Sequence, residues 1–293
     1  MALSCPPMAA FPTQTQTRSR FMHTSHIDIR AHFGLNALPF TREFPINKRF
    51  KHDPAEQALA ALRHTVEHRM SGVLMAPAGS GKTVVLRALV DELPEARYRC
   101  TYVKVTSLGK RDFCRELSKV IGCRSAGQYN TLVRNIQEHV SASVTGDGIR
   151  PLFLIDEAHD MAPEVLAILR ILTNFDMDSR LVLSVIVAGQ PRLASTLKRP
   201  ELAAVTGRMA HFATLRNFGR QELADYVRHR LTLAGARQPL FTDSAQDTLF
   251  ELGGGNPRAT DTLAFKALHI AAAKKASVVE ANDLLEARAQ VLP

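Results

Sequence analysis

Residues 76–83 have the composition of a loop that binds a phosphate chain. The expected pattern is G-x-x-x-x-G-K-[ST], and Ala76 replaces its first glycine. Backbone N–H groups that point into a concavity at a helix N-terminus bind phosphate oxygens, and the helix dipole strengthens this attraction. Because alanine is also small, we expect phosphate binding to survive the replacement. The residues expected to bind nucleotide are Ala78, Gly79, Ser80, Gly81, Lys82 and Thr83.

Two of these side chains have specific expected roles. Lys82 would reach the β- and γ-phosphates, and Thr83 would hold Mg²⁺ through its hydroxyl. An acid pair follows further along, where the apolar run 152–155 predicts a buried strand that delivers Asp156 and Glu157 at its carboxyl end. Asp156 would coordinate Mg²⁺, and Glu157 would polarise an attacking water. An Asp-Glu pair alone could be a solvated turn, but together with the loop it favours ATP hydrolysis.

An α/β sheet must position these residues. Apolar runs at 72–76, 102–105, 152–155 and 181–187 alternate with helical stretches, which indicates a parallel sheet covered on both faces. A helix is expected to start at Asp53-Pro54. Its core-facing residues are expected to be Leu59, Leu62, Val66 and Met70. Another is expected from Pro163 to Phe175.

Strand signals stop near Leu215, and helices are expected at 219–234, 242–252, 257–275 and 280–289. The fold class is therefore α/β, a parallel sheet flanked by helices and followed by a small all-helical domain. We expect a disordered leader at 1–26, an α/β nucleotide-binding domain at 27–214 and a helical domain at 215–293.

The composition is that of a globular protein that meets a polyanion. The chain has 293 residues, of which 45% are hydrophobic and 22% charged, with a formal net charge of +9. A basic balance favours nucleic acid or an anionic membrane surface as a partner. The four cysteines form no C-x-x-C pair, which favours free thiols in a reducing cytoplasm. No apolar run approaches the ~20 residues of a membrane helix, so we expect no membrane segment.

Taken together, the loop and the acid pair resemble those of AAA+ ATPases. Gln190, at the end of the next strand, matches the sensor-1 position of that family. Arg258, in Gly255-Asn256-Pro257-Arg258, matches the sensor-2 position, and the resemblance implies that it reaches the γ-phosphate. Arg208 matches an arginine finger that acts in trans on the nucleotide of a neighbouring subunit. Other arginines compete for that role: Arg192, Arg199 and Arg216. The resemblance implies ATP and Mg²⁺ as cofactors, a helical lid domain, and a homo-oligomer, either ring or filament.

Two flanking motifs narrow the resemblance to one branch. "HFGLNALPF" (32–40) and "YVRHRLTLAGA" (226–236) are similar to motifs of the target-selecting ATPases of bacterial transposons and of the A-type ATPases of general secretion. The similarity runs from about Ile27 to the C-terminus and implies a bacterial, cytoplasmic protein. Phe40 could lie near the adenine or in the core.

A basic cluster favours the transposition members of the branch. Its members, opposed in that stretch only by Asp112 and Glu116, are Lys104, Lys110, Arg111, Arg115, Lys119 and Arg124. Lysine and arginine contacts to phosphate give sequence-independent affinity for DNA, although a solvated helix face would look the same. Our main hypothesis is an ATP-dependent regulator of DNA transposition that assembles on double-stranded DNA and recruits a transposase, with hydrolysis driving disassembly.

Two other functions stay open. One is a secretion or envelope-assembly ATPase of the general secretion pathway A type, and the other is a nucleotide switch with negligible turnover. His64 and His68 match an H-x-x-E-H zinc pattern, but the helix reads as a packing element without a third ligand. A helix-turn-helix DNA reader around 253–255 is a minor alternative to the sensor-2 interpretation.

Overall fold

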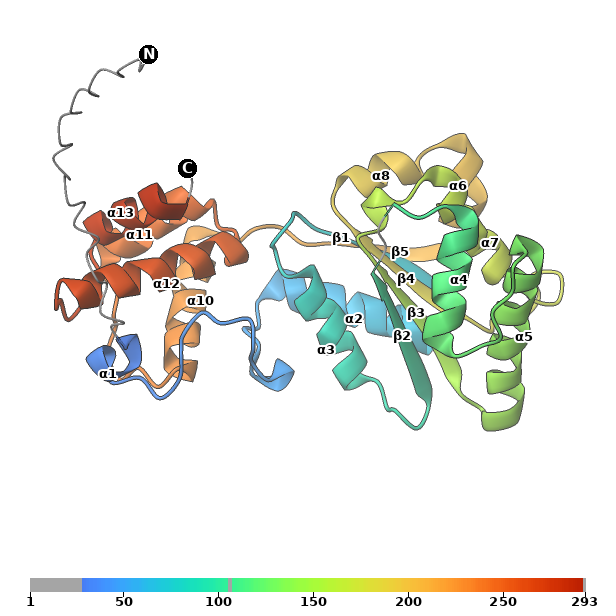
Figure 1. Ribbon diagram of the computed structural model, residues 1–293, viewed down its shortest axis with the longest axis horizontal. Helices are drawn as coiled ribbons and strands as arrows, with labels where there is room; N and C mark the ends of the chain where they lie inside the picture. The colour runs from blue at the N-terminus through green and yellow to red at the C-terminus, as the bar shows by residue number, and fades with distance from the viewer. Residues whose placement is uncertain (1–27, 105–106, 292–293) are drawn as a thin grey trace, which may run out of the picture.

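The computed structural model describes residues 28–104 and 107–291 (Figure 1). The leader expected at 1–26 lies outside these residues. Five parallel strands form one sheet in the order β2-β3-β4-β1-β5. Their bounds are β1 Ser71–Met75, β2 Tyr98–Lys104, β3 Arg150–Asp156, β4 Ser184–Gly189 and β5 Met209–Thr214. The fold class predicted from the sequence is confirmed.

Helices cover both faces of the sheet because successive side chains of each apolar strand point to opposite faces. On one face Leu74 and Ile186 pack with α2 and α3. On the other face Val73, Phe153 and Val185 pack with the helices that follow β2, β3 and β4. The bounds of these helices are α2 Asp53–Glu67, α3 Lys82–Glu92, α4 Lys110–Ile121, α5 Tyr129–Asp147, α6 Pro163–Leu166, α7 Ile168–Leu172, α8 Arg192–Leu197 and α9 Ala203–Thr206.

Three local features differ from the sequence reading. The strand β5 was not predicted, because only one face of this edge strand is buried and its apolar signal is broken by His211. The helix expected from Pro163 to Phe175 is interrupted at Ala167 and ends at Leu172. Met70 is exposed rather than in the core, because α2 ends at Glu67 and Arg69 turns the chain into β1 with a φ of 58°.

Four helices follow β5 and form a second core (Figure 1, orange and red). They are α10 Arg220–Leu233, α11 Asp243–Gly253, α12 Pro257–Ala273 and α13 Ala281–Val291. The segment 28–52, here called the N-terminal strap, contains the short helix α1 (Ile29–Phe33) and the 3₁₀ turn Ile46–Lys48. Its side chains Leu35 and Phe40 are buried in the core of the C-terminal helices, so this strap joins the two parts of the molecule.

The two motifs that carry the branch resemblance contact one another. The backbone N–H groups of Asn36 and Ala37, in the strap, both donate to the carbonyl of Ala234 at the end of α10, at 2.8 and 3.2 Å. Gly235 has a φ of 94°, and a Cβ there would lie 2.6 Å from the Asn36 side-chain nitrogen. The positive φ and this close approach favour glycine, so the two motifs pack against one another at Asn36 and Gly235.

Candidate active site

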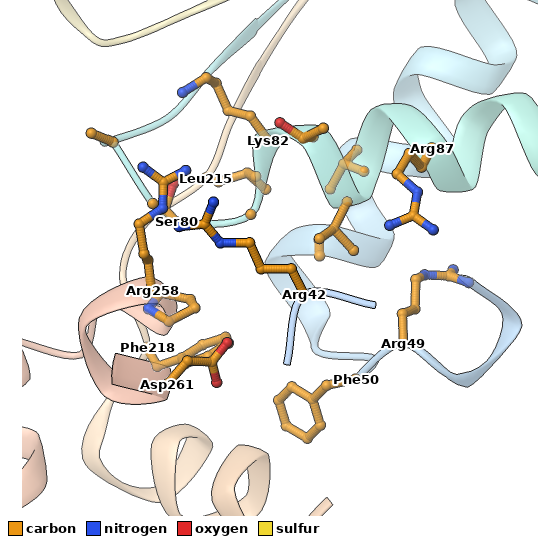
Figure 2. A pocket seen from close by; sticks show the side chains of 18 of the residues that line it. Arg42, Arg49, Phe50, Ser80, Lys82, Arg87, Leu215, Phe218, Arg258 and Asp261 are labelled. Atoms are coloured by element: carbon orange, nitrogen blue, oxygen red, sulfur yellow. The ribbon is translucent and has the colours of Figure 1, made fainter. Parts of the chain in front are cut away.

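The expected loop residues, the acid pair and Gln190 lie at the carboxyl edge of the sheet. The loop follows β1 and the acid pair follows β3, and β4 lies between these two strands. Gln190 therefore leaves the sheet between the loop and the acid pair. A cavity of about 900 Å³ opens at this edge (Figure 2). Among its lining residues are Ala78, Gly79, Ser80, Gly81, Lys82, Thr83, Glu157, Gln190 and Arg258.

The loop adopts the backbone path that phosphate binding needs. Gly79 and Gly81 have φ values of 80° and 103°, in the region that disfavours residues with a Cβ. Ala76, by contrast, has an ordinary negative φ, and its methyl group is buried among the apolar residues between the sheet and α2–α3. The replaced glycine was therefore not needed for the turn. Helix α3 begins at Lys82, so its free N–H groups face the cavity.

The acid pair is split between a buried and a half-exposed carboxylate. Asp156 is 2% exposed; its Oδ1 accepts the backbone N–H of Glu157 at 2.8 Å and its Oδ2 accepts the hydroxyl of Tyr102 at 3.0 Å. Burial and the neighbouring Asp156 carboxylate raise the pKa of Tyr102, which keeps this donor protonated. Glu157 has a φ of 57°, and its side chain lines the cavity.

These residues fit a magnesium ion brought with a nucleotide. Mg²⁺ in phosphate-transfer sites is held by one or two carboxylates together with phosphates and water. Asp156 offers a preorganised carboxylate whose two oxygens each retain a free lone pair, and Thr83 offers an exposed hydroxyl at the first turn of α3. The ion would neutralise phosphate charge there, while Glu157 is left to orient water.

A buried histidine beside Glu157 was missed by the sequence reading. The Nδ1 of His159 lies 3.3 Å from Glu157 Oε2 without hydrogen-bond geometry, and its side chain is almost fully buried. On its other side stands Asp160, which pairs with Arg192. The spacing Asp156-Glu157-x-His159 was the available signal, and the burial of His159 depends on a fold that packs this turn against Gly189 of β4.

The N-terminus of α12 is hydrogen-bonded to the loop. The side-chain nitrogen of Asn256 donates to the carbonyl of Ala78 at 2.7 Å, and the backbone N–H of Arg258 donates to that of Gly79 at 3.3 Å. The Asn256 oxygen also caps α12 by accepting from the N–H groups of its first turn. A Cβ on Gly79 would lie 2.6 Å from the Asn256 oxygen. The helical part is thus seated directly on the phosphate-binding loop.

Aromatic side chains form part of the cavity lining. Phe50 of the strap lies 5.7 Å from Phe218 and 5.6 Å from Tyr226, between ring centroids and in edge-to-face geometry. His52 packs edge-on to Phe218 at 4.8 Å. An apolar, aromatic wall next to a phosphate-binding loop suits a nucleoside base. Phe40 is buried among the C-terminal helices and also lines the cavity, and its placement near the adenine stays a prediction.

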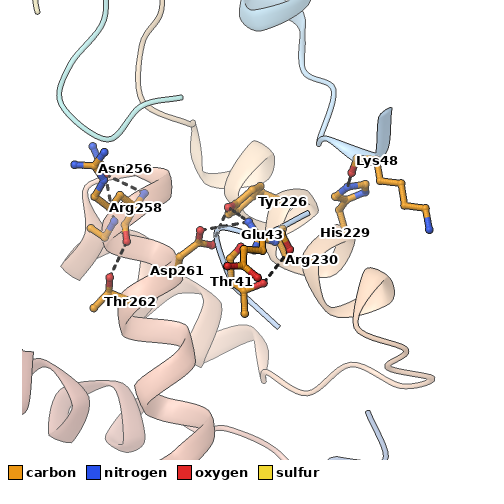
Figure 3. Close-up of polar contacts among 11 residues, drawn as sticks. Thr41, Glu43, Lys48, Tyr226, His229, Arg230, Asn256, Arg258, Asp261 and Thr262 are labelled. Atoms are coloured by element: carbon orange, nitrogen blue, oxygen red, sulfur yellow. Dashed lines mark hydrogen bonds and ion pairs between the residues drawn. The ribbon is translucent and has the colours of Figure 1, made fainter. Parts of the chain in front are cut away.

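A buried polar network joins α10, α12 and the strap (Figure 3). The hydroxyl of Tyr226 donates to Asp261 Oδ1 at 2.7 Å, and Arg230 Nη1 lies 3.3 Å from Asp261 Oδ2. Arg230 also donates to the carbonyl of Thr41. Burial raises the pKa of Asp261 to about 6 against the opposing effects of Arg230 and Tyr226. The network holds the strap against the helices at the rim of the cavity.

The remaining predicted residues divide into two groups. Arg258 enters the cavity from α12 (Figure 2), and so does Lys104 from the end of β2, away from the rest of the basic cluster. Arg208 lies elsewhere, where its guanidinium donates to Asp178 at 2.6 Å and to the carbonyl of Ala204 at 2.9 Å. Its competitors are also paired: Arg192 with Asp160, Arg199 with Glu201 and Arg216 with Glu222.

The solvent face of α4 carries most of the basic cluster. Phe113 and Leu117 are buried in the core, and the exposed cations on the outer side are Lys110, Arg111, Arg115 and Lys119. The i, i+4 spacing of three of them places them in one row. Asp112 lies beside this row, 2.8 Å from Arg115. None of the helices in the described part of the chain combines the length and apolarity required to cross a bilayer.

Comparison with known proteins agrees with this site. The model of the AAA domain family matches residues 63–197. General secretion pathway protein A of Aeromonas hydrophila is 33% identical over 257 residues, which are 86% of this chain and 46% of that protein. The chain therefore spans about half the length of this relative.

Solved structures share the fold at low sequence identity. Cdc6p from Pyrobaculum aerophilum superposes with a TM-score of 0.69 at 15% identity, over 86% of this chain and 70% of that one. The Aeropyrum pernix ORC1 protein, solved in complex with DNA, superposes with a TM-score of 0.61 at 13% identity, over 86% and 68%. The chain is therefore similar to General secretion pathway protein A over most of its own length, and it contains an AAA domain with the P-loop fold that the solved structures share.

Proposed function

We propose that this chain is the ATP-driven module of a secretion or envelope-assembly system. The site would serve an ATPase cycle in which the loop would hold the triphosphate, Asp156 the magnesium ion, and Glu157 the attacking water. Arg258 enters the same cavity from α12, so loss of the γ-phosphate would release a contact between the α/β part and the C-terminal helices. Hydrolysis would in this way be converted into movement of those helices.

The cellular role rests on one observation, the 33% identity to General secretion pathway protein A over most of this chain. Homology at this level extends beyond the catalytic motifs, since the matched region of 257 residues is longer than the AAA match at 63–197. This homology favours a secretion role over regulation of DNA transposition, the function that the basic cluster favours.

The test combines enzymology with genetics in the source organism. Purified chain should hydrolyse ATP in the presence of Mg²⁺, and Lys82→Ala should abolish nucleotide binding. Deleting the gene should reduce a secreted or envelope-assembled product, and only a copy with intact Glu157 should restore it. Normal secretion and envelope composition in the deletion strain would count against this role, and a secretion operon around the gene would support it.

Regulation of DNA transposition stays as a second candidate because of the basic row on α4. Such a row would follow a DNA backbone, with ATP-driven assembly into a ring or filament and Arg208 acting on the neighbouring nucleotide. Duplex-DNA affinity would then rise with a non-hydrolysable ATP analogue and fall when Lys110 and Arg111 are neutralised. Neutralising Arg134 and Arg228, two exposed arginines outside α4, is the matched control. Equal affinity in all these proteins would remove this candidate, whereas a neighbouring transposase gene would support it.

A further inference from the structure

Several cations that the motifs do not predict line the cavity, and Arg42 is one of them. Arg42 belongs to the N-terminal strap, lines the cavity, and is directed toward the phosphate-binding loop near Ser80 (Figure 2). Arg258 enters the same space from α12, and Lys82 belongs to the loop itself. Three cationic side chains from three separate segments of the chain therefore converge on the region where a nucleotide's phosphates would bind.

The backbone on both sides of Arg42 is fixed. Thr41 accepts a hydrogen bond from Arg230 of α10 through its carbonyl. The carbonyl of Phe44 accepts from Arg87 of α3 at 3.4 Å, and the Arg230 guanidinium lies 5.1 Å from the Phe44 ring centroid. Because the strap is held from both the α/β part and the C-terminal helices, Arg42 is presented to the cavity by a defined backbone.

Arg42 lacks a direct acidic partner. Among residues 28–104 and 107–291, no carboxylate lies within ion-pair distance of its guanidinium. Arg42 lowers the pKa of Asp261 only at longer range, and Asp261 is already bonded to Tyr226 and Arg230. Cationic side chains that line one cavity repel one another, and water screens this repulsion at the exposed Arg42. That arrangement becomes favourable when a polyanion enters, and arginine matches phosphate oxygens with two parallel donors.

We propose that Arg42 binds the phosphate chain of the nucleotide and thereby couples nucleotide occupancy to the N-terminal strap. The inference rests on the proposed ATPase function and adds a phosphate ligand outside the loop. Its consequence is that a bound nucleotide touches the loop, α12 and the strap at once, and so holds all three together.

The test compares nucleotide affinities of Arg42→Gln and a matched control. Lys51→Gln removes an exposed charge nine residues along the same strap, and Lys51 is not among the residues that line the cavity. ATP, ADP and adenosine are titrated against the full chain by calorimetry, after thermal melting shows that both variants are folded. Losing a charge-assisted hydrogen bond is expected to weaken ATP binding about tenfold or more, ADP binding to a similar or smaller extent, and adenosine binding hardly at all.

Two results would overturn the inference. If Arg42→Gln binds ATP as tightly as Lys51→Gln, Arg42 does not contact the phosphates. If it weakens adenosine as much as ATP, the side chain serves the base or the local fold instead. Failure of the unmodified chain to bind ATP is distinct from both, because it refutes the proposed ATPase function and this inference with it.

Discussion

The contact between the phosphate-binding loop and α12 can be tested by adding one methyl group. In Gly79→Ala the new Cβ would lie 2.6 Å from the Asn256 oxygen and 2.9 Å from Arg258 Cβ. Both distances are shorter than van der Waals contact, so α12 must move away from the loop. Two hydrogen bonds would then be lost, from Asn256 to Ala78 and from Arg258 to Gly79.

The magnitude follows from strain and from these two bonds. A residue with a Cβ in the left-handed region costs on the order of 1–3 kcal/mol. Each lost hydrogen bond adds roughly 0.5–1.5 kcal/mol. Gly81→Ala is the matched control: its φ of 103° is further from the left-handed minimum than the 80° of Gly79, but nothing lies within 4 Å of its Cβ. Strain alone therefore predicts that Gly81→Ala is the more destabilising change, and the steric contact predicts the reverse.

The assay is urea unfolding of both variants without nucleotide, so that phosphate binding does not enter. We expect Gly79→Ala to lose about 1–3 kcal/mol more unfolding free energy than Gly81→Ala. Adding Asn256→Ala should relieve part of the clash, so the double variant should lose less than the sum of the two single variants. Equal losses at both glycines, together with additivity in the double variant, would refute the proposed seating of α12 on the loop.

Three further outcomes are expected. Glu157→Gln should retain ATP affinity and lose turnover by about 10²-fold or more; unchanged hydrolysis would indicate that another group orients the water. The pKa of Asp261 is raised from 3.8 to about 6, so its contribution to stability is complete below about pH 4 and is lost as pH rises through 6. The unfolding free energy of the wild type should therefore fall by about 3 kcal/mol between pH 4 and pH 7 through this group. Urea titrations of Asp261→Asn should not show this fall. If the two proteins have the same pH profile of stability, Asp261 does not have the buried environment described above. Gly255→Ala should unfold at a lower temperature than Gly254→Ala. The φ values of the two glycines are similar (67° and 58°), but only at Gly255 would a Cβ meet a backbone oxygen, that of Phe218 at 2.1 Å. Equal melting temperatures would contradict this close approach.

Part of the site was determined by local sequence. A phosphate-binding loop needs positive-φ glycines, a lysine and a hydroxyl within one turn, and an acid pair needs only a buried strand before it. These requirements are met within residues 76–83 and 152–157, so spacing alone predicted them. Even the replaced glycine at Ala76 was tolerable for a local reason, since the backbone there has a negative φ.

Other parts depend on contacts between residues far apart in the chain. Asn256 meets Ala78, Arg42 enters a cavity formed by the loop and α12, and β5 pairs with β1 although His211 interrupts the apolar residues of its buried side. No periodicity encodes such pairs, because hydrophobic spacing specifies which face of an element is buried and not which element covers it. The sequence by itself determined the chemistry of the loop and the acid pair, whereas tertiary packing decided which distant side chains complete the cavity around them.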